Sequence, residues 1–497
     1  MNRKMVLYFV GRIIMVEGAL LLFPTLVGLY YGERITFSFL LIAALAFVLG
    51  RAMSIRKPKN TVFFAKEGFA AVALAWFLLS AVGALPFWVS GYVPSYIDAL
   101  FEVVSGFTTT GSSILTGVEH LPRALLFWRS FTHWVGGMGV LVFAMAVIPM
   151  SDKRSMHLMR AEVPGPTVGK LLPKLRDTAK ILYALYLLLS LVLFILLILG
   201  GMTPFDSAIH TFGTAGTGGF SSWNSSIGHY DSAYIDWVIT IFMALFGINF
   251  NLYFFLALRN WKAAFKNEEL WWYLGIMVFS SVTIAWNILP LKGSFMNALR
   301  YAAFQVATVM TTTGYATADF NLWPAFSKGM MVLLMFIGAS AGSTGGGLKV
   351  SRLLIMGKAA KREIYRLLHP RMVTTVSMDE KPVAEATITG AYMYLVIYVF
   401  IAAVSTIILS LDNFDLETTF TAMAACLNNI GPGLSIVGPT GNYSTFSDLS
   451  KIVLIFDMLI GRLEIFPVIF GLAFPFWGSK KKKEVKAYVP ASEINNL

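Results

Sequence analysis

The chain has 497 residues, of which 57% are hydrophobic and only 13% charged, and its formal net charge is +12. A soluble protein of this length needs more charge to cover its surface, so the composition excludes the ordinary soluble classes and indicates an integral membrane protein. The single cysteine, Cys426, excludes an intrachain disulfide and a cysteine metal cluster, and we expect it to be a buried apolar residue.

Long apolar segments predict an all-α fold with about ten membrane-spanning helices. They lie at 5–30, 36–55, 66–90, 124–149, 179–202, 233–258, 270–290, 328–356, 386–411 and 450–477. The first is too long for the core of a signal peptide, so we expect it to be retained. Four shorter apolar segments of about 10–14 residues suit half-length re-entrant helices. They lie at 95–108, 204–215, 297–310 and 415–428, each between two long spans.

Each half-length segment ends in a stretch with a central glycine. The four stretches are TTTGS at 108–112, GTGGF at 216–220, TTTGY at 311–315 and NNIGP at 428–432. Their glycines are roughly a hundred residues apart, a spacing typical of a repeat architecture. We predict two N-terminal spans (1–60), then four span–pore-helix–span repeats around a pseudo-fourfold pore (61–155, 156–262, 263–372 and 373–479), and a basic cytoplasmic tail (480–497).

The basic residues indicate which loops face the cytoplasm. They gather at 51–66, 153–180, 259–266, 358–371 and 480–483, which we assign to the inside; the tail is also expected to meet anionic lipid. The glycine stretches then open to the outside, where a negative mouth would concentrate cations, although several of its acids are equally well placed as helix caps. These acids are Asp98, Glu102, Glu119, Asp206, Asp231, Asp236, Asp319, Asp412, Asp415, Glu417 and Asp448.

The four glycine stretches have the chemistry of an ion filter. Backbone carbonyls replace the water around a weakly hydrated cation where an extended chain turns them toward one axis. Glycine permits the required φ values, and the carboxyl end of each pore helix adds a negative dipole pole. The alternatives are four unrelated outer loops and, in the fourth stretch, Gly433 in place of Gly431. The candidate ion-binding residues are Thr109, Thr110, Gly111, Thr217, Gly218, Gly219, Thr312, Thr313, Gly314, Asn429, Ile430 and Gly431.

A second candidate site is the glycine-rich run at 338–347, inside the predicted span 328–356. Each glycine costs a helix about 1 kcal/mol relative to alanine, so the span should break in mid-membrane and form a movable gate below the filter. Close packing through small residues is the alternative. Lys349 either pairs with an acid or marks the cytoplasmic end of its span. The candidate gate residues are Gly338, Gly342, Ser343, Thr344, Gly345, Gly346, Gly347 and Lys349.

Arg462 is a charge within the last span, where ionisable residues usually face a water path or a partner. We predict that it stands near the pore as a barrier to cations; a structural ion pair with Asp457 or Glu464 is the alternative. The histidines lack metal-ligand spacing, and no catalytic arrangement is visible, so we expect neither an enzyme nor a cofactor.

These stretches, together with GSTGGGLK at 342–349 and MLIGRLEIFPV at 458–468, resemble the Trk/Ktr/HKT superfamily of potassium transporters, in particular the bacterial TrkH-type membrane subunits. The resemblance covers the whole chain. It implies a multi-pass protein of the bacterial inner membrane, a filter of Gly111, Gly219, Gly314 and Gly431, the gate at 338–347 and a pore arginine at Arg462. It also implies a homodimer and a cytosolic RCK-type nucleotide-binding regulatory subunit, TrkA-like.

Two functions remain open from the sequence. The first is potassium uptake through the filter, because relatives with serine in place of the first filter glycine tend to admit sodium and this chain has Gly111. The alternative is a Na⁺- or H⁺-coupled secondary transporter with alternating access, for which Asp457 and Glu464 would be the mid-membrane carboxylates.

Overall fold

The computed structural model describes residues 2–56, 58, 65–139, 175–371, 374–463, 465 and 467–468. The N-terminal addition consists of α1 (Arg3–Leu20), α2 (Leu22–Tyr31) and α3 (Thr36–Ser54), with α1 and α2 forming one apolar segment. Gly11 and Gly50 let α1 and α3 approach closely, because a Cβ on either would meet the backbone of the other helix.

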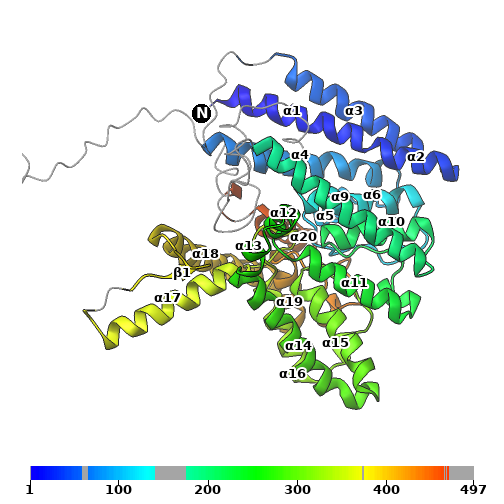
Figure 1. Ribbon diagram of the computed structural model, residues 1–497. Coiled ribbons are helices and arrows are strands. Elements are labelled where there is room, and N and C mark those ends of the chain that lie inside the picture. The colour runs from blue at the N-terminus through cyan, green and yellow to red at the C-terminus, as the bar shows by residue number, and fades with distance from the viewer. Residues whose placement is uncertain are drawn as a thin grey trace, which may run out of the picture.

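The rest of the described chain repeats three elements four times (Figure 1). The first spans are α4 (Ala65–Val89), α9 (Leu175–Leu199), α14 (Glu268–Lys292) and α18 (Glu385–Leu409). The pore helices are α5 (Tyr96–Phe107), α10 (Pro204–Gly216), α15 (Phe295–Met310) and α19 (Leu416–Leu427). The second spans begin with α6 (Arg123–Gly137), α11 (Ala233–Phe246), α16 (Ala325–Ile337) and α20 (Asp448–Leu463).

Smaller elements connect these repeats. They are α12 (Phe250–Ala257), α13 (Trp261–Phe265), α17 (Val350–Leu368), the strands β1 (Ser377–Met378) and β2 (Lys381–Pro382), and the short 3₁₀ helices Ser226–Tyr230, Phe320–Leu322, Ser410–Asp412 and Ser435–Val437. Helix α17 leaves the bundle beside α18 (Figure 1).

Polar residues fix where the four pore helices begin. In each, the N-cap side chain accepts a hydrogen bond from the backbone N–H three residues later, which satisfies one otherwise unpaired donor. The caps are Ser95, Thr203, Ser294 and Asp415. The hydrogen bond from the Thr418 hydroxyl lowers the pKa of Asp415, which keeps this cap charged. Asp98 and Asp206 stand in the first turn of their helices.

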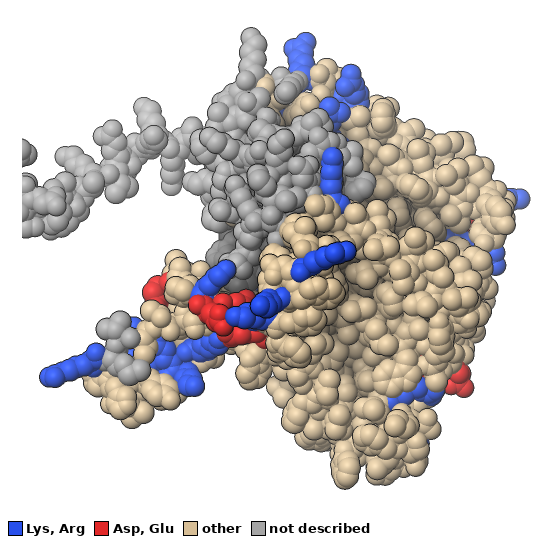
Figure 2. Space-filling model, viewed as in Figure 1, with Lys and Arg blue, Asp and Glu red and all other residues tan. Residues whose placement is uncertain are grey.

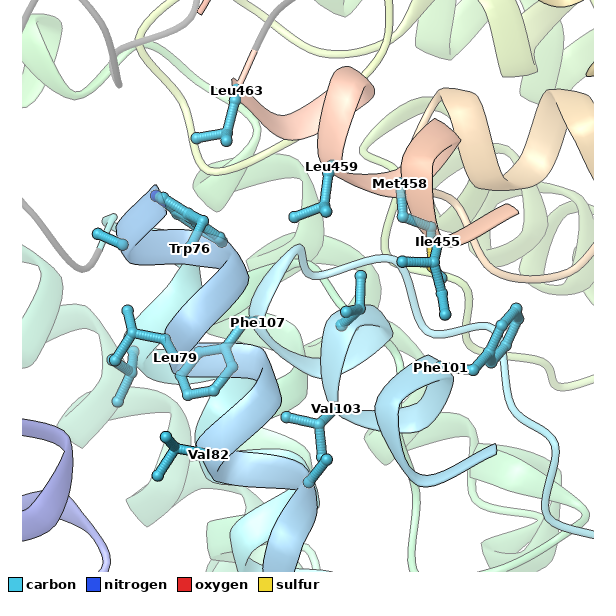
Figure 3. Packing of buried hydrophobic residues seen from close by; sticks show 14 of the residues in the cluster. Trp76, Leu79, Val82, Phe101, Val103, Phe107, Ile455, Met458, Leu459 and Leu463 are labelled. Atoms are coloured by element: carbon cyan, nitrogen blue, oxygen red, sulfur yellow. The ribbon is translucent and has the colours of Figure 1, made fainter. Parts of the chain in front are cut away.

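The repeats close into a ring because each second span packs against the pore helix of the next repeat. Helix α6 packs against α10, α11 against α15, α16 against α19, and α20 returns to α5. Figure 3 shows the closing contact, where α5 lies between α4 and α20. The packed side chains include Trp76, Leu79 and Val82 of α4, Phe101, Val103 and Phe107 of α5, and Ile455, Met458 and Leu459 of α20.

The spans differ from expectation at two places. The segment 233–258 is not one straight helix, since α11 and α12 meet at 89°. Asn249 causes this break by capping α12 through the N–H of Asn251. The segment 328–356 divides into α16 and α17, as the glycine run predicts, but α17 continues to Leu368. The segments 124–149 and 450–477 extend into residues outside the described part.

By length and composition, six helices in the described ranges can cross a membrane, or seven when α11 and α12 count as one span. This number is lower than the ten spans that were predicted. Part of the difference comes from the second spans of repeats one and four, because segments 124–149 and 450–477 reach beyond the described residues. The tail at 480–497 also lies outside the described residues.

Charged side chains gather near α13, α17 and the β1–β2 hairpin, while the helix bundle shows few in the view of Figure 2. The hairpin, which the sequence pattern did not predict, docks on the start of α14: Asp379 accepts a hydrogen bond from the N–H of Glu268 at 2.8 Å. Lys358 of α17 pairs with Glu268 and donates to the carbonyl of Ser377 at 2.8 Å.

Several outer acids, predicted to make a negative mouth, are neutralised by neighbouring bases. Their partners come from other elements, and in three of the four pairs from another repeat, so these acids contribute less to a long-range field. The pairs are Asp98–Lys451 (2.6 Å), Glu102–Arg129 (2.5 Å), Asp236–Arg300 (3.5 Å) and Glu417–Lys328 (3.3 Å).

Candidate ion-conducting site

The four glycine stretches share one backbone conformation. Two residues before each glycine, a non-glycine residue adopts the left-handed region: Thr109 (φ 57°), Thr217 (56°), Thr312 (58°) and Asn429 (56°). The glycines follow with φ of 83° at Gly111, 78° at Gly219, 89° at Gly314 and 97° at Gly431. This region is strained for residues with a Cβ, and its fourfold recurrence marks a constrained site.

Hydrogen bonds to the last turn of each pore helix hold this conformation. In every repeat, the residue before the central glycine donates its N–H to a carbonyl five residues earlier. The four bonds are Thr110 to Ser105 (2.9 Å), Gly218 to Gly213 (2.8 Å), Thr313 to Thr308 (2.7 Å) and Ile430 to Ala425 (2.8 Å). The stretches are therefore structurally equivalent despite their different side chains.

The stretches also meet one another in a closed cycle. A Cβ on Gly111 would collide with the carbonyl oxygen of Gly218, and one on Gly219 with that of Thr313. A Cβ on Gly314 would collide with the carbonyl oxygen of Ile430, and one on Gly431 would lie 2.8 Å from that of Thr110. Each glycine thus gives room to a carbonyl of another repeat, and a side chain at any of these four positions would displace that carbonyl.

A cavity of about 100 Å³ lies on the outer side of this ring and is lined by all four glycines. Its wall includes Arg129, Phe220, Trp223 and Tyr443. Gly433, the alternative fourth glycine, instead faces the Thr421 side chain, and its φ is outside the left-handed region. The geometry therefore places Gly431 in the ring with the other three glycines.

Hydroxyl groups support the first and third stretches from behind. The hydroxyls of Thr108 and Thr110 are 2.7 Å apart, and those of Thr311 and Thr313 repeat the same distance. Asn429 donates its amide to the Thr110 hydroxyl at 2.9 Å, which joins the fourth stretch to the first.

The glycine-rich run lies directly behind the ring. Gly346 donates its N–H to the Thr312 hydroxyl at 2.6 Å, and a Cβ on Gly345 would lie 2.9 Å from the carbonyl oxygen of Thr311. A Cβ on Gly346 would collide with the carbonyl oxygen of Asn428. The run therefore reaches both the third and the fourth stretch.

The other side of the run is tied to the break between α11 and α12. Ser340 donates its N–H to the Gly247 carbonyl at 3.1 Å, and Phe250 donates to the Gly342 carbonyl at 3.0 Å. The Thr344 hydroxyl donates to the carbonyl of Phe246 at 3.2 Å. The two interrupted spans thus satisfy each other's free backbone groups, as non-helical backbone at membrane depth requires.

Lys349 and Glu269 hold the run next to the start of α17. Glu269 of α14 accepts hydrogen bonds from the N–H groups of Ala341 at 2.7 Å and Ser351 at 3.1 Å. Lys349 adopts φ 77°, precedes α17 and donates its ammonium group to the carbonyl of Gly345. Lys349 therefore stands at the start of α17 and contacts the run itself.

Arg462 connects this run to the first repeat. Its guanidinium donates to the carbonyls of Thr344 (2.6 Å), Gly136 (2.6 Å) and Gly137. Of its two predicted acidic partners, Asp457 accepts from the Ser405 hydroxyl at 2.8 Å, and Glu464 lies outside the described residues. A charge-assisted link thus joins α20, the end of α6 and the glycine-rich run.

Several buried charged residues were not singled out from the sequence as site residues. Arg129 binds Glu102 and donates to the carbonyl of Ser221 at 3.2 Å, next to the second stretch. Glu269 supports the glycine-rich run, and Glu17 lies fully buried in α1. Arg129 could have been identified from the sequence, because an arginine inside the apolar segment 124–149 is as unusual as Arg462 in the last span.

Comparisons with known proteins agree with this geometry. A family model described as TrkH, cation transport protein, matches residues 35–270 and 276–475. The "Trk system potassium uptake protein TrkH" of Escherichia coli strain K12 is 36% identical over 487 residues, which cover 96% of this chain and 100% of that protein. The protein of the same name from Vibrio parahaemolyticus is 34% identical over 490 residues, with coverage of 96% and 100%.

The comparison with solved structures gives the same result for the fold. The crystal structure of the potassium transporter TrkH from Vibrio parahaemolyticus superposes with a TM-score of 0.85 at 32% identity. The match covers 96% of this chain and 100% of that one. The expectation of a helical membrane protein of this superfamily is confirmed.

Proposed function

Because this chain belongs to the TrkH family of cation transport proteins, we propose that it takes up potassium ions across the bacterial inner membrane. The observation that carries the proposal is the closed cycle of four glycine stretches, each giving room to a carbonyl oxygen of another repeat. A single polypeptide thus brings four equivalent sets of carbonyls to one place beside an outer cavity.

In the proposed mechanism, K⁺ enters the outer cavity and exchanges water for peptide oxygens of the ring. The residues that would contact it are the twelve filter candidates, from Thr109–Gly111 in the first stretch to Asn429–Gly431 in the fourth. Four pore-helix carboxyl ends point their negative poles toward the ion and lower the cost of its dehydration. The hydroxyl contacts behind the first and third stretches hold the carbonyls at a fixed spacing.

The glycine-rich run at 338–347, together with Lys349, is the proposed gate. It lies against the inner side of the ring, and Lys349 and Arg462 place two buried cationic groups on its carbonyls. Their charge opposes a cation that leaves the filter, so conduction requires the run to move away. The Arg462 link to Thr344 and Gly136 holds the run closed until that movement occurs.

Regulation and assembly are proposed from the family resemblance and one structural feature. Helix α17 follows the run and leaves the bundle near the charged hairpin (Figure 1), and its basic residues at 358–371 assign it to the cytoplasmic side, so a protein bound there would pull on the gate directly. A cytosolic nucleotide-binding regulatory subunit is the proposed partner, and a homodimer is the proposed assembly.

The test is ion flux in liposomes that contain the purified protein. The proposal predicts K⁺ and Rb⁺ uptake well above that of Na⁺, and an intact protein without K⁺ flux would refute it. The alternative of Na⁺ or H⁺ coupling draws on Asp457, whose second carboxylate oxygen has no hydrogen-bond partner among the described residues. A reversal potential that shifts with pH or Na⁺ at fixed K⁺ would favour coupling.

A further inference from the structure

The second glycine stretch differs from the other three at the position before its central glycine. Thr110, Thr313 and Ile430 carry buried side chains there, whereas the second stretch has Gly218. All four positions make the same backbone hydrogen bond to their pore helix. Gly218 is also outside the left-handed region, so its backbone conformation does not require glycine.

The space that a side chain at position 218 would take is filled by His133 of α6. A Cβ on Gly218 would collide with Cγ, Nδ1 and Cδ2 of the His133 ring. The ring belongs to the first repeat and is fully buried. Its Nδ1 donates to the carbonyl of Gly106, at the end of the first pore helix, at 2.7 Å.

His133 also holds the residue that follows the second filter glycine. The centre of its imidazole lies 4.1 Å from the centre of the Phe220 ring. The Arg129 guanidinium also lies over the Phe220 ring, 3.4 Å from its centre. Arg129 and His133 are one helical turn apart on α6, so both side chains of this helix face pack against Phe220. Gly137, further along α6, allows the close approach, since a Cβ there would lie 2.6 Å from the backbone of Gly216.

We infer that His133 is a positioning residue for ion selection, which supplies from the first repeat the side chain that the second stretch lacks. The inference rests on the proposed function and extends it to a residue outside the filter. Its ring sets the distance between the first pore helix and the second stretch. The carbonyl of Gly218, which lies directly against Gly111 of the neighbouring stretch, is thereby held in place.

A double-mutant cycle in liposomes tests this inference through the ratio of Rb⁺ to Na⁺ uptake. His133→Ala leaves a void behind Gly218, and Gly218→Thr forces the ring away, so each single change should lower the ratio about tenfold. The double variant H133A/G218T places a threonine in the void, as at positions 110 and 313. Its ratio should return to within about twofold of the wild type. His133→Gln keeps a donor for the Gly106 carbonyl and should lose less than His133→Ala.

The outcomes separate this inference from the proposed function. Wild-type protein that fails to take up Rb⁺ would refute the proposed function itself. Two results would overturn only the role of His133. The first is a ratio of Rb⁺ to Na⁺ uptake in His133→Ala that equals the wild-type ratio. The second is a ratio in the double variant no higher than that of the worse single variant. If His133→Ala does not fold, the comparison of the double variant with Gly218→Thr decides, because only the inference predicts that removing the ring rescues the threonine.

Discussion

The substitution Gly314→Ala tests the ring most sharply. Gly314 has φ 89°, and a Cβ there would collide with the carbonyl oxygen of Ile430 and lie 3.0 Å from Cδ of Pro432. To restore ordinary contact, that carbonyl must move by about 1 Å. The left-handed conformation adds roughly 1–2 kcal/mol of strain for an alanine.

A carbonyl displaced by this distance no longer replaces a water of hydration at its original position. If most of the strain of about 1–2 kcal/mol appears in ion binding, the ratio of Rb⁺ to Na⁺ uptake should fall roughly 5- to 30-fold. The assay is uptake of both ions by liposomes that contain equal amounts of folded protein, with the wild type measured in parallel.

Two matched controls separate the contact from other effects of the substitution. Gly293→Ala introduces alanine at φ 71°, where nothing lies within 4 Å of the added Cβ. Gly390→Ala makes the same change within α18, again with open space around it. Both should keep the wild-type ratio. An unchanged ratio in Gly314→Ala, or an equal fall in Gly293→Ala, would refute the reasoning.

The remaining predictions concern the first filter glycine, the gate and the buried ion pair. Gly111→Ser should relax selectivity toward Na⁺, because its Cβ collides with the Gly218 carbonyl; unaltered Na⁺ exclusion would contradict this. Deletion of residues 343–347 should increase K⁺ leak, and reduced flux would count against the gate. Arg462→Met removes the charge and the carbonyl contacts, so resting K⁺ leak should rise about tenfold. Glu102→Gln leaves Arg129 without its carboxylate and should lower the melting temperature by several degrees, measured by light scattering in detergent.

Hydrophobic length predicted most of the helices well. The segments 36–55 and 270–290 correspond to Thr36–Ser54 and Glu268–Lys292, and the half-length segment 95–108 corresponds to Tyr96–Phe107. The signal is strong because a span must be continuously apolar over about 20 residues. The bend between α11 and α12 was missed because Gly247 and Asn249 interrupt an otherwise apolar segment too briefly to change its hydropathy.

The contacts between repeats could not be predicted from the sequence. Periodicity shows that four equivalent stretches exist, but not that the carbonyl of Gly218 lies against Gly111 or that His133 stands behind Gly218. These neighbours are set by the packing of α6 on α10, between residues distant in the chain. The pairing of Glu102 with Arg129, between two helices of the first repeat, could not be predicted either, because two single charges in a sequence do not show that they meet.

Rubidium in place of potassium offers the most direct measurement of the central claim. A crystal structure of the protein in RbCl, with anomalous scattering recorded at the Rb edge, locates bound ions without reference to sequence or family. The account predicts an anomalous peak enclosed by the stretches of Gly111, Gly219, Gly314 and Gly431. A bound Rb⁺ ion found elsewhere in the membrane region, with none at this ring, would contradict it.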